Sequence, residues 1–131
     1  MRTGATLAGN RIPGGIQVTV YAADKIAKGT IVEIVDPYKV AVPSAAGSDK
    51  ILGMVMTDQK NAGDEFIVEA RGKAIQTLKC GAAISAPGPV VIDDEGKVIP
   101  LTAEGNADRA IYGLALTETA EADELVDVLV Y

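Results

Sequence analysis

The chain has 131 residues, a formal net charge of −6, and 48% hydrophobic but only 4% aromatic residues. This length suits one domain, and the acidic balance argues against nucleic-acid binding, because phosphates attract clustered cations. The sequence contains no histidine, which removes the commonest general base and metal ligand, and no apolar run approaches the ~20 residues of a membrane helix. We therefore expect a soluble protein without a signal peptide.

The N-terminal stretch 1–15 contains several glycines and one proline among scattered apolar side chains, and it carries two arginines and no acid. This composition predicts a flexible N-terminal arm over residues 1–15. Two interpretations remain open: a frayed terminus, or a segment that orders on a partner by adding a strand to a sheet edge. The candidate partner-binding residues of the arm are Arg2, Thr6, Leu7, Arg11 and Ile12.

From residue 16 onward, apolar and polar residues alternate in short runs that end at Gly, Pro, Asn or Asp, a pattern typical of a sandwich or barrel. Asp36-Pro37-Tyr38 suits a turn between two strands, because proline presets φ there. Only Tyr21–Ala27 and Thr117–Asp123 could hold a helical turn. We predict one all-β domain over residues 16–131. Its strands are expected at Ile16–Tyr21, Ile31–Val35, Lys39–Val42, Leu52–Thr57, Glu65–Ala70, Lys73–Leu78, Val90–Asp93, Lys97–Leu101, Ala110–Thr117 and Leu125–Val130.

The sequence also repeats itself at a nearly constant spacing, with pseudo-repeats at about 28–72 and 87–131. The matched features are Gly29–Val32 with Gly88–Val91, Asp36 with Asp94, Lys39-Val40 with Lys97-Val98, Gly53 with Gly113, and Asp64-Glu65 with Asp123-Glu124. Such a repeat indicates one supersecondary unit used twice to close a shared core. We predict a pseudo-symmetric compact barrel.

Catalytic and cofactor motifs are missing from the sequence. There is no phosphate-binding Gly-x-x-x-x-Gly-Lys-Ser/Thr loop and no Gly-x-Ser-x-Gly, and a Ser-His-Asp arrangement is impossible without histidine. Asp93–Gly96 could bind a cation loosely but is more typical of a hairpin turn, and Arg71–Lys73 could bind an anion but fits an exposed turn. Cys80 is expected to be a small buried hydrophobe. We expect no catalytic residue, no metal site and no cofactor.

From Ala27 onward, over about four-fifths of its length, the chain resembles the small capsid decoration (cement) proteins of tailed phages and prophages. The residues that carry the resemblance are Lys28–Val32, Ile51–Met56, Ala62–Val68, Arg71–Ala74, Gly88–Asp93, Ile111–Leu116 and Val126–Leu129. Their order and spacing together are more specific than any one motif.

The resemblance implies a compact β-barrel of the β-clip or β-tulip sort, with an N-terminal arm that contacts the major capsid protein. It further implies a homotrimer on the outside of an expanded icosahedral head, at local threefold points, and synthesis in the host bacterial cytoplasm. The protein is then not an enzyme, and its partners include neither nucleic acid nor a membrane.

Two other functions stay open. Asp24–Ile31 resembles the opening of carbohydrate-binding β-clip modules, although one phenylalanine and four tyrosines offer few rings for stacking on sugars. The chain could also be a lid or fragment of a larger hydrolase, which would require a groove lined with paired carboxylates.

Overall fold

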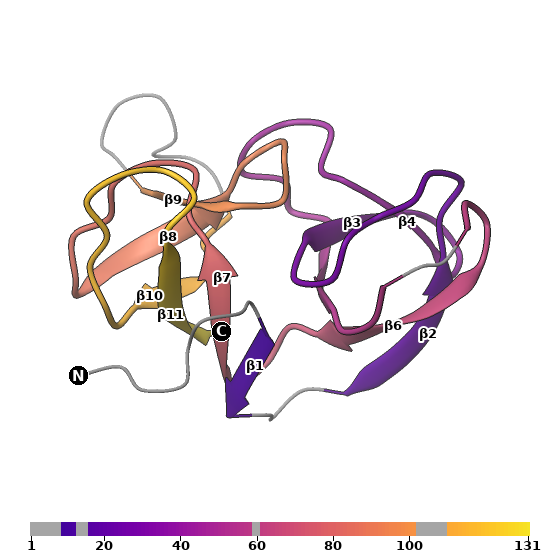
Figure 1. Ribbon diagram of the computed structural model, residues 1–131, viewed down its shortest axis with the longest axis horizontal. Coiled ribbons are helices and arrows are strands. Elements are labelled where there is room, and N and C mark those ends of the chain that lie inside the picture. Colours follow the sequence, from indigo (N-terminus) through magenta and orange to yellow (C-terminus); the bar gives the residue numbers. More distant parts are fainter. Residues whose placement is uncertain (1–8, 13–15, 59–60, 102–109) are drawn as a thin grey trace.

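The computed structural model describes residues 9–12, 16–58, 61–101 and 110–131. In this part of the chain there are strands and turns but no helix, so the all-β prediction is confirmed (Figure 1). The strands are β1 (Gly9–Ile12), β2 (Gln17–Tyr21), β3 (Ile31–Asp36), β4 (Lys39–Ala41), β5 (Ile51–Val55), β6 (Glu65–Ala70), β7 (Ala74–Lys79), β8 (Gly88–Ile92), β9 (Val98–Pro100), β10 (Gly113–Ala115) and β11 (Leu125–Val130).

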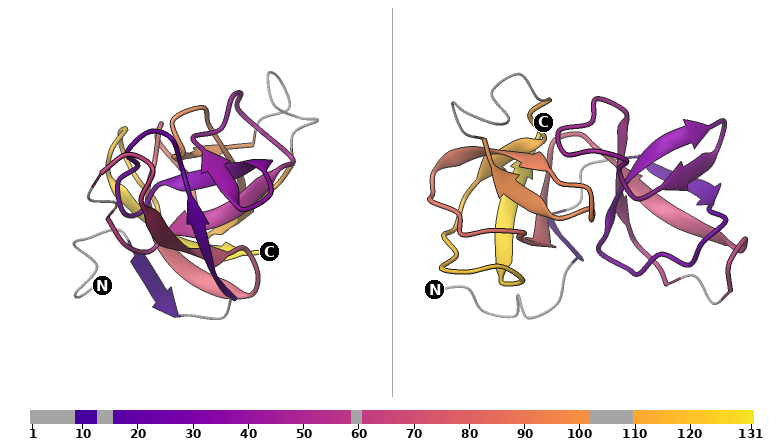
Figure 2. Two further views of the ribbon diagram at one scale, coloured as in Figure 1. Left: turned by 90° about the vertical axis from the view of Figure 1, so that its right-hand side faces the viewer. Right: turned by 90° about the horizontal axis from the view of Figure 1, so that it is seen from above.

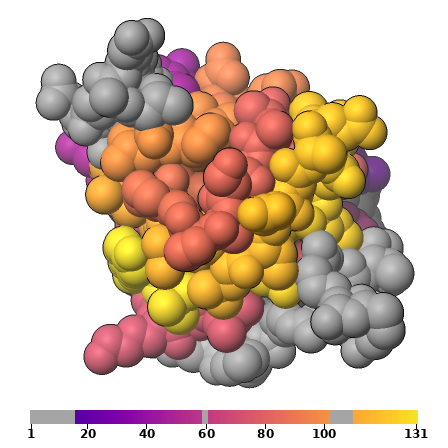
Figure 3. All heavy atoms as spheres, turned by 90° about the vertical axis from the view of Figure 1, so that its left-hand side faces the viewer, coloured from indigo at the N-terminus to yellow at the C-terminus, as the bar shows by residue number. Residues whose placement is uncertain are grey.

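The strands form two sheets that lie side by side (Figure 2). The first is a closed barrel with the order β2-β4-β3-β5-β6, which we call the barrel lobe. The second has six strands in the order β1-β7-β11-β10-β8-β9, which we call the C-terminal lobe. On the face turned away from the barrel, this second lobe is covered mainly by the C-terminal part of the chain (Figure 3).

The two lobes share one arrangement of strands. In the barrel lobe the neighbours run β2-β6-β5-β3-β4, and in the C-terminal lobe they run β7-β11-β10-β8-β9. A parallel contact joins the two ends in both cases: Tyr21 pairs with Lys39, and Cys80 pairs with Val98. Both members of the second pair follow those of the first at the spacing of the sequence repeat. The repeat therefore describes two copies of one β-unit.

A glycine stands at the same place in each copy. Gly53 on β5 pairs with Ala70 on β6, and Gly113 on β10 pairs with Val130 on β11. A Cβ atom on Gly53 would overlap the backbone carbonyl of Glu69, and one on Gly113 would overlap that of Leu129. Glycine is therefore required at both places by the close approach of two backbones.

The lobes are held together by a core that crosses between them. The larger hydrophobic cluster combines C-terminal residues such as Leu78 and Val90 with Ile31, Ile51 and Met54 from the barrel lobe. A smaller cluster fills the barrel itself. Because apolar burial is the main stabilising contribution to a fold, the shared cluster makes the two lobes one structural unit.

Buried polar groups also join the lobes. Gln76 on β7 donates a 3.0 Å hydrogen bond from Nε2 to Oε1 of Glu69 on β6, and accepts a 2.6 Å bond at Oε1 from the Tyr112 hydroxyl. All three side chains are buried. The guanidinium of Arg71 lies over the Tyr112 ring, 5.1 Å from its centroid, and burial raises the pKa of the Tyr112 phenol. A satisfied network of this kind fixes how the lobes pack.

Candidate functional site

The predicted arm contributes a strand to the chain's own sheet. β1 pairs antiparallel with β7, with Gly9 opposite Thr77, Asn10 opposite Gln76 and Ile12 opposite Ile75. Two of the five candidate partner-binding residues, Arg11 and Ile12, therefore lie together on the edge strand of the C-terminal lobe.

The other three candidates, Arg2, Thr6 and Leu7, lie outside the described residues. The sequence alone suggests Arg11 and Ile12 as anchors on a partner and predicts no strand there. In the single chain, this part of the arm instead pairs with a sheet edge of its own fold.

The barrel lobe carries an apolar groove of about 220 Å³. Its lining residues come from β2, β3, the β3–β4 turn, β4 and β5: Val18, Val20, Ile34, Pro37, Tyr38, Val40 and Leu52. Two of them are open to solvent, with Tyr38 69% exposed and Ile34 42% exposed. None of these described lining residues carries a carboxylate, so the groove does not match the paired acids that a glycoside hydrolase would need.

Large exposed apolar side chains gather on the same lobe. Those of the barrel lobe are Ile16, Tyr21, Ile34, Val35, Tyr38 and Val42. The C-terminal lobe exposes Ile111, Leu116, Leu129 and Tyr131. Only Ile34 and Tyr38 of these line the groove, and Val35 and Val42 line a second pocket of the same lobe. The groove thus joins two exposed apolar side chains to a lining without charge, which is the character of a contact surface.

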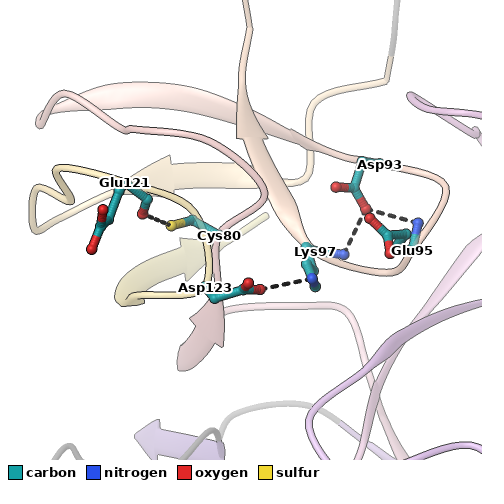
Figure 4. Close-up of polar contacts among 6 residues, drawn as sticks. All are labelled: Cys80, Asp93, Glu95, Lys97, Glu121 and Asp123. Carbon is teal, nitrogen blue, oxygen red and sulfur yellow. Dashed lines mark hydrogen bonds and ion pairs between the residues drawn. The ribbon is translucent and has the colours of Figure 1, made fainter.

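The acidic segment at Asp93–Gly96 is a hairpin turn between β8 and β9. Oδ1 of Asp93 accepts hydrogen bonds from the backbone N–H groups of Glu95 (2.8 Å) and Lys97 (2.9 Å) (Figure 4). These bonds occupy the carboxylate within the turn. Among the described residues, no group of three or more Cys, Asp or Glu side chains could hold a metal ion. Within the same residues, no helix has the length and apolar character to cross a membrane.

An ion pair links that hairpin to the loop before β11. Nζ of Lys97 lies 2.7 Å from Oδ1 of Asp123, and this contact lowers the pKa of the Asp123 carboxyl and raises the pKa of the Lys97 ammonium (Figure 4). Both groups face solvent, so the pair contributes little to stability. The arrangement holds two loops together and offers no reacting centre.

Cys80 and Arg71 have structural roles. Cys80 is buried, as predicted, and its thiol donates to the carbonyl oxygen of Glu121 at 3.1 Å (Figure 4). The Arg71 guanidinium donates to the carbonyl oxygen of Ile111 at 2.7 Å. The sequence suggests Arg71 in an exposed turn that could bind an anion, but its charge is turned inward, onto Ile111 and the Tyr112 ring.

Sequence reasoning misses the groove and the residue that stands most openly on its rim. It predicts a turn at Asp36-Pro37-Tyr38, which the structure has, but it gives Tyr38 no further role. A signal is available in the repeat, because Tyr38 precedes Lys39 in the first copy where Gly96 precedes Lys97 in the second. Because the equivalent turn of the second copy has glycine, the turn itself does not require a tyrosine, which indicates another role for the Tyr38 side chain.

Comparisons with known proteins bear on what this surface is for. The family model described as phage cement protein matches residues 11–130. Among solved structures, the N base of the head fiber gp8.5 of bacteriophage phi29 is similar, with a TM-score of 0.65 and 14% identity. The match covers 90% of this chain and 95% of that one, and at this identity it shows a shared fold. No curated protein matches the sequence.

Proposed function

The chain belongs to the phage cement protein family, and from this we propose that it binds the outside of an expanded phage head as a homotrimer and stabilises the shell. The observation that carries the proposal is the family match over residues 11–130. The partner is the major capsid protein of a tailed phage, and no catalytic step is involved. The protein is made in the host bacterial cytoplasm and ends on the outer surface of the virion.

To stabilise the shell, the protein needs only to bind its expanded form more tightly than its precursor form. A protein that binds the expanded shell and not its precursor shifts the equilibrium toward the expanded state by mass action. Three binding elements on one trimer raise avidity by ~10²–10⁴ over one element, provided that all three engage at once. An acidic body with a basic N-terminal segment would also orient the trimer as it approaches, and salt would screen that effect.

The arm is proposed as one of the contacts, through Arg2, Thr6, Leu7, Arg11 and Ile12. Support comes from the charge of the segment, which carries Arg2 and Arg11 and no acid. Further support comes from β1, because this part of the segment already pairs with a sheet edge. As the outer strand of its sheet, β1 places Arg11 and Ile12 at an edge where a partner segment can pair beside them.

Co-sedimentation with expanded, undecorated heads of the cognate phage tests the proposal. The wild-type chain is expected to bind saturably, and a chain lacking residues 1–8 is expected to bind less tightly while keeping β1. Removing residues 1–15 would also expose the β7 edge, so the shorter deletion is the cleaner variant. Arg2→Gln is the matched point variant and Lys25→Gln, on an exposed loop of the barrel lobe, its control.

Sedimentation equilibrium tests the trimer, which requires a mass of about three times 13.5 kDa. No binding to heads by the wild-type chain at concentrations well above micromolar would overturn the cement role. A glycan array would then test the carbohydrate-binding alternative.

A further inference from the structure

The barrel closes between β2 and β4 through Tyr21 alone, so within the described residues the rest of β2 has an open edge on the side away from β6. The N–H of Tyr21 points to that side, where it donates to the carbonyl oxygen of Tyr38 at 3.0 Å. The carbonyl of Ile16 points to the other side and accepts from the N–H of Ala70 at 2.7 Å. Because bonding direction alternates along an antiparallel ladder, the N–H and C=O groups of Gln17 and Thr19 face the same side as those of Tyr21.

Among the residues that the structure describes, only the last residue of β2 has a strand partner on that side. β4 pairs with β2 at Tyr21 alone, and within the described residues no strand pairs with Gln17–Thr19 there. Backbone donors and acceptors of that stretch are therefore available for a further strand.

The edge also lacks the usual protection against strand addition. Exposed edges are commonly blunted by charged residues, proline or bulges. The outer strands of the C-terminal lobe follow this rule, since β1 contains Arg11 and β9 ends at Pro100. β2 reads Gln-Val-Thr-Val-Tyr, without charge or proline, and its ladder with β6 is regular. An unprotected edge of this kind can accept an added strand from a partner.

The equivalent edge in the other lobe shows what covers it. Ile75, Gln76 and Thr77 on β7 pair with β1. Ala70 and Val130 are equivalent, because they pair with Gly53 and Gly113. Ala70 bonds to Ile16 and Val130 pairs with Ala74, so Ile75, Gln76 and Thr77 correspond to Gln17, Val18 and Thr19 of the first copy. The stretch of β7 that pairs with β1 therefore occupies the same place in the β-unit as the unpaired stretch Gln17–Thr19 of β2. In the C-terminal lobe an added antiparallel strand completes this position, whereas in the barrel lobe it is open.

The apolar groove lies beside the open edge, with Val18 and Val20 of β2 among its lining residues. Tyr38 on its rim has a φ of +57°, and Gly96 at the corresponding place has a φ of +77°. A left-handed conformation costs a residue other than glycine ~1–2 kcal/mol. The Tyr38 ring is mostly exposed, so its packing within the lobe does not offset this cost. Such a strained, exposed side chain is characteristic of a binding surface.

We propose that the β2 edge and its groove together form a docking site for an extended segment of the phage shell protein, which adds to β2 as an antiparallel strand. The inference rests on the proposed function, because the family membership identifies a shell as the partner. A second copy of this chain is a poorer donor, since each chain has one β1 and uses it on its own β7 edge.

The pairing of β1 with β7 also indicates the chemistry of the segment. The transferred register places a small residue opposite Thr19, a polar residue opposite Val18 and a branched aliphatic residue opposite Gln17. Gly9, Asn10 and Ile12 stand in these places on β7. Alternate side chains of an added strand face one side of the sheet, so one set would enter the groove. Main-chain bonds supply affinity in this mode, and the groove supplies specificity.

Two pairs of variants test the site by co-sedimentation with expanded, undecorated heads. Thr19→Pro removes an N–H on the open side and leaves the β6 ladder intact, and Thr19→Val is its control because it keeps that N–H. Ile34→Lys places a charge in the groove, and Leu116→Lys is its control, since both residues are 42% exposed. Thr19→Pro and Ile34→Lys are expected to weaken binding at least ~10-fold, with both controls within ~2-fold of wild type. Melting curves check that all four variants fold.

If Thr19→Pro and Ile34→Lys bind heads as tightly as the wild-type chain, the docking site is wrong, whereas the cement function is still supported by wild-type binding. A second readout is independent of heads: a synthetic peptide of residues 7–14 titrated into the labelled full chain. Shifts at the amides of Gln17 and Thr19 support the edge as a strand acceptor. Shifts confined to residues 75–77, or none at millimolar peptide, count against it even if heads are bound.

Discussion

The hydroxyl of Tyr112 donates a 2.6 Å hydrogen bond to Oε1 of Gln76, between two side chains that are almost fully buried. Gln76 in turn donates a hydrogen bond from Nε2 to Oε1 of Glu69 in the barrel lobe. One phenol therefore anchors a chain of polar contacts that crosses from one β-unit to the other. Removing this one oxygen atom therefore tests how much the polar contacts between the lobes contribute to the free energy of unfolding.

Tyr112→Phe removes that hydroxyl and leaves Oε1 of Gln76 without its donor. Losing one partner of a buried hydrogen bond costs ~1–3 kcal/mol, so the free energy of unfolding should fall by about that amount at neutral pH. Urea unfolding followed by circular dichroism measures the change. Tyr131→Phe is the control, because the Tyr131 side chain is exposed and should tolerate the same change within ~0.5 kcal/mol. Equal losses in both variants would contradict the role of the buried contact.

The same residue predicts a loss of stability at alkaline pH. Burial raises the pKa of Tyr112 above the ordinary value of 10.0, so above that pH the unfolded chain releases the phenol proton while the folded chain keeps it. Stability from this group is complete below about pH 10 and declines as pH rises, by up to ~1.4 kcal/mol per pH unit. The gap in unfolding free energy between wild type and Tyr112→Phe should therefore narrow between about pH 9 and about pH 11. A gap that stays constant would show that Tyr112 does not titrate as its burial predicts.

Gly53→Ala and Gly113→Ala should each destabilise the protein strongly and to a similar extent. In both cases the new methyl group meets a backbone carbonyl of the neighbouring strand, which cannot move aside like a flexible side chain. Overpacking costs ~1–3 kcal/mol where neighbours can adjust, and we expect at least the upper end here. Chemical denaturation measures both variants. If only one of the two variants loses stability, the strands around Gly53 and Gly113 are not equally close, and the two copies differ in strand spacing.

Lys97→Gln should raise the pKa of Asp123. The Lys97 ammonium lowers that pKa first by a hydrogen bond and then by its charge, and the variant removes the charge. The contribution of Asp123 to stability is present above its unfolded-state pKa and is lost as pH falls through the folded value. A carbon-detected NMR titration of the Asp123 carboxyl in wild type and variant measures the shift. An unchanged titration curve would mean that the pair is open in solution.

Tyr38→Gly should separate stability from binding. It removes the left-handed strain but adds entropy to the unfolded chain, so stability should change by no more than ~1 kcal/mol, in the favourable direction. Head binding should fall, because the variant removes the ring from the groove rim. The reciprocal variant Gly96→Ala should lose stability, since its Cβ would meet the backbone carbonyl of Ile31. A Tyr38→Gly protein that binds heads as wild type does would remove this side chain from the docking site.

Much of the fold is accessible from the sequence, because its strands are marked by local patterns. The predicted strands Leu125–Val130 and Glu65–Ala70 have the bounds that the structure has, since an aspartate-containing turn signal precedes each run of β-forming residues. β10 is shorter than predicted, covering Gly113–Ala115 within the expected Ala110–Thr117. The apolar run continues past the ladder there, and periodicity cannot show where pairing stops.

β1 is not predictable in the same way. Gly-Asn-Arg-Ile has weak β propensity, and its partner strand β7 begins only at Ala74, so no local pattern marks it. The groove is inaccessible for a related reason, because β2, β3, β4 and β5 meet there only after the barrel has closed. What the sequence does contain is the equivalence of Tyr38 and Gly96 in the repeat, and a comparison of the two copies singles out that turn.

The position of β1 bears on how the chain is made. A ribosome releases Gly9–Ile12 early, but the strand that completes its ladder, β7, follows only after the whole barrel lobe has been translated. The barrel can close on its own strands during that interval, while the first strand waits for Ile75–Thr77. A truncated translation product that ends before β7 therefore carries this segment without its native neighbour. The first described strand is thus completed later than every strand of the barrel lobe, and its docking marks a chain that has been synthesised past Thr77.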